Sequence, residues 1–73
     1  MSPRLPRVTA SDIVRLLKRR GFAFSRQSGS HAIYKDAQGR RVTVPVHAGK
    51  ILHPKVLKNI LNDAELDARD LEE

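Results

Sequence analysis

A histidine placed directly behind a small turn is the strongest candidate for chemistry in this sequence. Ser28-Gly29-Ser30 is a turn-forming run, and His31 follows it at the start of a strand-like segment. Histidine side chains exchange protons near neutral pH. The amides of Ser28, Gly29 and Ser30 can form an anion-binding nest, and Gly29 lets a phosphate approach the backbone closely. The pattern indicates proton transfer beside a bound phosphate, unless Gly29 is an ordinary loop glycine and His31 an ordinary surface histidine.

Two other histidines and one serine have weaker claims on the same chemistry. His47 follows the third predicted strand and either reaches the active face, where it can bind phosphate, or is a loop histidine. His53 precedes a predicted helix and is expected to cap it. Ser30 is a poor nucleophile for His31, because adjacent strand residues point to opposite faces, so it is a phosphate contact or a turn residue. No two histidines have the i, i+4 spacing of helical metal ligands, and we expect no metal and no cofactor.

The positive charge of the chain is concentrated before its C-terminal tail. The 73 residues carry a net charge of +6, but residues 1–62 hold 13 of the 14 Lys and Arg residues and two of the eight acids, a net charge of +11. A folded unit this basic attracts polyanions such as nucleic acids. RNA brings its own nucleophile, the 2′-OH, so cleaving it requires proton transfer and charge stabilisation but no metal.

The cations nearest to His31 in the predicted fold are either phosphate partners, though not all of them, or a solvated basic face. Those on strands and loops are Arg26, Lys35, Arg40, Arg41 and Lys50. The Lys18–Arg20 cluster at the end of the first helix competes with them for nucleic acid. Tyr34 either stacks on an unpaired base or is structural.

Composition and length exclude several protein classes. The chain has no cysteine, so it has neither a disulfide framework nor a cysteine–zinc site. No apolar run reaches the length of a membrane span, and the N-terminus lacks the apolar region of a signal peptide. We therefore expect one small cytoplasmic domain with no membrane partner.

Start and stop signals define two helices. Thr9 and Asp12 have the spacing of a capping box, and Gly21 is placed to end the first helix in a Schellman motif. Pro54 is a favoured first residue for the second helix, with His53 as its N-cap.

Three strand-like segments lie between the helices, at residues 22–27, 31–35 and 40–46. Short loops favour an antiparallel meander, with Pro45 at an edge or a strand end. The predicted fold is α+β, in the order α-β-β-β-α, with both helices on one face of the sheet. The expected core comprises Ile13, Leu16, Leu17, Val42, Val44, Leu57, Ile60 and Leu61.

The period of the second strand places His31 relative to this core. His31, Ile33 and Lys35 share one face. If Ile33 packs under the helices, His31 lies at the sheet margin, where that face opens to solvent.

Three segments and the order of elements resemble the HicA family of toxins of bacterial toxin–antitoxin systems. The segments are Gly29-Ser30-His31, Val42–His47 and Gly49-Lys50. The resemblance covers about residues 9–66. It implies a double-stranded-RNA-binding-domain-like fold and a metal-independent endoribonuclease (mRNA interferase) of the bacterial stress response, with His31 catalytic. It further implies mRNA as substrate and a HicB-like antitoxin that covers His31. The family pattern is broken at Ala32, where a polar residue is common, and at Glu65, where a glycine is common.

We divide the chain into a basic N-terminal arm (1–8), one HicA-like RNA-binding nuclease domain (9–66) and an acidic C-terminal tail (67–73) that contains a short helix. The tail either screens the basic face or only solvates the C-terminus. Two other functions stay open on the residues alone: a non-catalytic RNA- or DNA-binding module, and an adaptor whose basic face docks an acidic protein.

Overall fold

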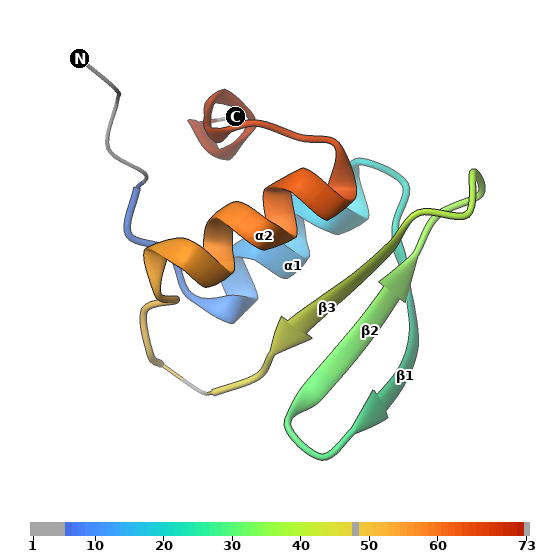
Figure 1. The fold of residues 1–73 in the computed structure, drawn as a ribbon, viewed down its shortest axis with the longest axis horizontal. Helices are drawn as coiled ribbons and strands as arrows, with labels where there is room; N and C mark the ends of the chain where they lie inside the picture. The colour runs from blue at the N-terminus through green and yellow to red at the C-terminus, as the bar shows by residue number, and fades with distance from the viewer. Residues whose placement is uncertain (1–5, 48, 73) are drawn as a thin grey trace.

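The computed structural model describes residues 6–47 and 49–72, so residues 1–5 of the predicted basic arm lie outside the described residues. Figure 1 shows the elements in the predicted order along the chain: a helix, three strands and a second helix, followed by a short 3₁₀ helix. The elements are α1 (Ala10–Arg19), β1 (Ala23–Ser28), β2 (His31–Lys35), β3 (Arg41–Pro45), α2 (Pro54–Ala64) and η1 (Ala68–Glu72).

Both predicted caps of α1 are confirmed. The Thr9 amide donates to the Asp12 carboxylate at 2.9 Å, and the Asp12 amide donates to the Thr9 hydroxyl at 3.3 Å. At the other end, the Phe22 amide donates to the Leu17 carbonyl at 2.9 Å, which is the longer bond of a Schellman motif. This motif keeps Phe22 buried beneath the helix end, so β1 begins one residue later than predicted, at Ala23.

α2 begins as predicted and ends on an unusual residue. His53 is its N-cap, and its Nδ1 atom accepts from the Lys55 amide at 3.1 Å. Glu65 follows the helix with φ +57°, in the left-handed region, and the Leu66 amide then donates to the Leu61 carbonyl at 2.8 Å. Glu65 thus fills the position where a glycine is common, at a cost of about 1–2 kcal/mol in backbone strain.

The three strands form one antiparallel sheet in the order β1-β2-β3, which confirms the meander. His31 stands between Ser28 of β1 and Pro45 of β3, at one end of the sheet. Lys35 pairs with Arg41 at the other end. Pro45 lies at the end of an edge strand, where its missing amide costs no ladder hydrogen bond.

The two faces of β2 have different partners. Ala32 and Tyr34 pack in the main core with Val42 and Val44, directly opposite them on β3. Since side chains alternate along a strand, His31, Ile33 and Lys35 belong to the other face. We call this the open face. The notion that Ile33 packs under the helices is therefore wrong: Ile33 is buried, but it stands outside the helix-packed core.

The predicted core is confirmed, because every one of its eight members is at most 4 % exposed. The core joins α1 and α2 to one face of the sheet, and β3 is the strand nearest to the helices in Figure 1. Burying side chains of this size stabilises the fold by about 1.5–3 kcal/mol each.

The predicted short helix in the tail is present as the 3₁₀ helix η1. The Asp67 amide donates to the Asp70 carboxylate at 2.9 Å, and Asp70 also accepts from Arg20 of α1 at 2.8 Å. Leu71 packs against the core, so this segment belongs to the helical side of the molecule. Within residues 6–47 and 49–72, no helix is long and apolar enough to span a membrane.

Candidate functional site

The candidate site is built on the hairpin between β1 and β2. Its loop has two residues, Gly29 and Ser30, and Gly29 has φ +57°. Among described non-glycine residues, Glu65 alone has a positive φ, so Ser30 does not. A positive φ at the first loop residue only is the pattern of a type II′ turn, which selects glycine there. The Gln27 side chain also donates to the Gly29 carbonyl at 2.9 Å. His31 follows at once and is held in place by this turn.

The hairpin is tied to the segment behind β3. The Val46 amide donates to the Ser30 carbonyl at 2.6 Å, one residue beyond the pair formed by His31 and Pro45. The glycine turn, His31 and the start of the loop that carries His47 therefore lie at the same end of the sheet. The His31 side chain is exposed and makes no hydrogen bond or ion pair with another described residue. It is free to meet a ligand.

Two adjacent cavities open beside His31. One has a volume of about 360 Å³ and lies where α2 runs beside the edge strand β3; it is lined by His31, Thr43, Pro45, Val56, Asn59, Ile60 and Asp63. The second, of about 230 Å³, is lined by Pro45, His47, Lys50, Ile51, Leu52, His53 and Val56. Since both cavities share Pro45 and Val56, the structure brings His31, His47 and Lys50 to one continuous region. We call the first of them the His31 cavity.

The strand cations share the open face with His31 but lie at different distances from it. Arg26 pairs with Ile33, two residues along β2 from His31. Lys35 and Arg41 pair at the far end, and a rise of about 3.3 Å per residue puts them about 13 Å from His31 along the strand. One phosphate cannot contact all of them. A polyanion reaches the whole set only by running along the open face.

Arg40 has a structural role and is not available as a phosphate partner. Its guanidinium binds the Asp36 carboxylate and the Gln38 side chain, and it lies 5.8 Å from the centre of the Phe22 ring. Burial raises the pKa of Asp36, but hydrogen bonds from the side chain and amide of Arg40 outweigh it and leave that pKa below its ordinary value. Asp36 and Arg40 therefore close the turn between β2 and β3.

Tyr34 has the structural role, which was one of the two alternatives predicted for it. It is 7 % exposed in the helix-packed core, and its ring meets Phe24 edge to face with centroids 5.8 Å apart. No unpaired base can stack on it without opening the core.

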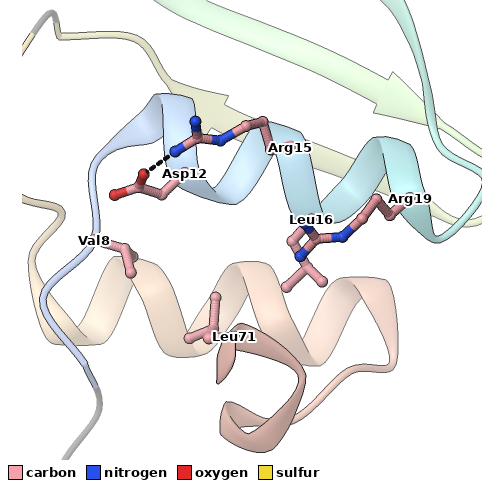
Figure 2. Close-up of a pocket in the computed structure, with 6 residues that line it drawn as sticks. All are labelled: Val8, Asp12, Arg15, Leu16, Arg19 and Leu71. Carbon is pink, nitrogen blue, oxygen red and sulfur yellow. Dashed lines mark hydrogen bonds and ion pairs between the residues drawn. The ribbon is translucent and has the colours of Figure 1, made fainter. Parts of the chain in front are cut away.

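The Lys18–Arg20 cluster lies apart from the His31 cavity. Arg20 binds Asp70 of η1. Figure 2 shows a separate pocket between α1 and η1, lined by Val8, Asp12, Arg15, Leu16, Arg19 and Leu71. α1 leads into Ala23 of β1, which pairs with Lys35 at the end of the sheet away from His31. These cations cannot reach a phosphate held at the glycine turn.

The sequence did not single out Asn59 and Asp63, which line the His31 cavity from α2. They are four residues apart, so they are neighbours on one helix face. Their spacing beside Val56 and Ile60 was visible, but no pattern showed that this face turns toward His31. Among the described residues, no three His, Asp or Glu side chains are grouped closely enough to hold a metal ion.

Comparison with known families now adds an independent observation. The family model described as HicA toxin of bacterial toxin–antitoxin systems matches residues 10–66. This range runs from the first residue of α1 to the residue after Glu65, so it contains the hairpin, His31 and both cavities beside it. No curated protein matches the chain.

Proposed function

Because the chain belongs to the HicA family of toxins of bacterial toxin–antitoxin systems, we propose that it is an endoribonuclease that cleaves mRNA in the cytoplasm without a metal ion. The observation that carries this proposal is the placement of His31. It is exposed, follows a glycine turn and borders a cavity on a basic face. This placement supports proton transfer by His31 and charge stabilisation by nearby cations, which RNA cleavage by its own 2′-OH requires.

In the proposed reaction, one RNA phosphate sits against the hairpin turn. A Cβ atom built on Gly29 would meet nothing within 4 Å, so the space above the turn is open to a phosphate. His31 accepts the proton of the 2′-OH as its oxygen bonds to phosphorus. The bond from phosphorus to the 5′ oxygen breaks, which leaves a 2′,3′-cyclic phosphate, and the 5′ oxygen takes up a proton from water. General base catalysis of this kind contributes about 10²–10⁴-fold to a rate.

The remaining predicted contacts serve to bind RNA. Ser28 stands opposite His31, and His47 and Lys50 line the neighbouring cavity. Arg26, Lys35 and Arg41 extend the positive charge along the open face, where further phosphates of the same strand can bind. Binding through several phosphates makes affinity fall steeply with salt concentration.

An antitoxin of the HicB type is the proposed partner. Two exposed apolar side chains support a protein contact near His31: Val46 is 40 % exposed and Ile51 is 51 % exposed. Both lie in the segment that follows β3, at the His31 end of the sheet. A protein that covers them shields His31 from RNA, and acidic groups on it would pair with the cations of the open face.

A non-catalytic RNA-binding module is the second candidate, because the basic open face would serve binding alone equally well. Purified protein incubated with labelled single-stranded RNA in EDTA separates the two. We expect RNA fragments to accumulate with time. Retention of intact RNA in a stable complex over hours would favour the binding module.

A further inference from the structure

The His31 cavity contains an acid that phosphate binding does not explain. Asp63 of α2 is exposed and lines the cavity that His31 borders, next to the cations of the open face. A carboxylate repels phosphate, so its presence beside the proposed cleavage site weakens binding unless it meets a hydrogen-bond donor. The side chains of Asp63 and Asn59 make no hydrogen bond or ion pair with another described residue. Their polar groups are available to a ligand.

Apolar side chains form much of the remaining lining of the cavity. Ile60 is buried at 2 % exposure, Val56 is half-buried, and Pro45 closes the sheet side. The volume of about 360 Å³ lies within the range of about 300–1,000 Å³ that is typical of small-ligand sites. Flipped or unpaired bases bind in such pockets, between apolar side chains, with polar groups on their Watson–Crick edge. The cavity has both parts.

We propose that the His31 cavity holds the guanine base of a nucleotide next to the cleaved phosphate, read by Asp63 and Asn59. This inference rests on the proposed RNA cleavage. A carboxylate only accepts hydrogen bonds. Guanine alone among the four bases has two adjacent donors on its Watson–Crick edge, at N1 and N2, whereas the other bases place an acceptor beside each donor. The Asn59 amide, a neighbour of Asp63 on α2, donates to the guanine O6 atom.

The test compares cleavage of matched RNA oligonucleotides by the parent protein, Asp63→Asn and a control. The oligonucleotides differ in one base beside a single cleavable bond: guanine, inosine, which lacks the N2 donor, or adenine. Glu65→Gln is the control, since it removes the same charge two residues away and outside the cavity. A bidentate base contact discriminates by about 5- to 150-fold in kcat/KM. We expect the parent and Glu65→Gln to prefer guanine by that factor and to lose much of it with inosine. Asp63→Asn should cleave all three alike.

Several results would overturn the inference and leave the proposed function intact. One is cleavage by the parent that depends on His31 but shows no guanine preference. Another is an Asp63→Asn protein that keeps its preference while all rates fall and the pH profile moves, which would make Asp63 a positioning residue for His31. A third is unchanged preference with weaker antitoxin binding, which would assign the cavity to the protein partner. No cleavage by the parent at all would refute the proposed function itself.

Discussion

The hairpin turn at Gly29 offers a test that separates stability from function. Gly29→Ala places a Cβ atom where nothing lies within 4 Å, so the substitution creates no clash in the free protein. Its cost comes from φ +57°, a conformation that costs an L-residue about 1–2 kcal/mol. The lower entropy of the unfolded alanine chain offsets about 0.4–1 kcal/mol of this. We expect a net loss of about 1 kcal/mol, equivalent to a fall in Tm of about 4–8 °C.

Gly39→Ala is the matched control. Gly39 has φ +85° and equally open surroundings, but it lies in the turn between β2 and β3, at the other end of the sheet from His31. Both variants should therefore lose similar stability. If a phosphate binds against the hairpin turn, only Gly29→Ala places a methyl group in its way and weakens RNA cleavage.

Two measurements on the same samples separate a loss of stability from a loss of phosphate binding. Urea unfolding gives the free energy of unfolding of each variant, and cleavage of labelled RNA at 25 °C, where all three proteins are folded, gives kcat/KM. We expect at least a tenfold lower kcat/KM for Gly29→Ala and an unchanged value for Gly39→Ala. Equal activity of the two variants would refute the idea that phosphate approaches the backbone at Gly29.

Three further predictions concern the fold. Glu65→Gly should raise the free energy of unfolding by about 1 kcal/mol in urea titrations, because it relieves the left-handed strain at the end of α2 and gives up only a long contact to Arg40, at 3.6 Å; a lower value would show that this contact matters more. Asp36 has a lowered pKa, so the stability it contributes is present above about pH 4 and is lost as pH falls through its folded-state pKa. The slope of unfolding free energy between pH 2 and about pH 5 should be smaller in Asp36→Asn. Leu57→Ala should cost about 2–5 kcal/mol by the same assay, since its side chain is 1 % exposed in the core; a cost below 1 kcal/mol would contradict the packing described.

The helices and strands could be predicted from the sequence because the signals that define them act over a few residues. Thr9 with Asp12, and Pro54 after His53, mark helix starts by hydrogen bonds that the nearby chain alone supplies. The period of two in β3 likewise identified its buried face. Long-range packing was the part that could not be deduced. The segment around Ile33 can bury either face in principle, and only the pairing of Ala32 with Val44 decides that Ile33 and His31 lie on the open face, outside the helix-packed core.

The candidate site likewise has residues that local sequence could predict and residues that only long-range packing brings together. His31 and Gly29 were found because turn, glycine and histidine are adjacent in the chain. In the sequence Arg40 could not be distinguished from the neighbouring cations as a phosphate partner. The structure shows that its guanidinium binds Asp36 and lies over the Phe22 ring. Asp63 was missed because it is about 30 residues from His31 in sequence. The packing of α2 beside β3 brings the two to one cavity.

The proposed function depends above all on proton transfer by His31 during RNA cleavage. Its direct test is the single-turnover cleavage rate of His31→Ala against the parent, in EDTA, with RNA saturating both proteins. The His31 side chain is exposed and makes no hydrogen bond or ion pair with described residues, so unfolding of the variant in urea should match the parent. We predict a rate lower by about 10²–10⁴-fold with RNA affinity little changed. A His31→Ala protein that cleaves RNA as fast as the parent would show that His31 does not transfer the proton.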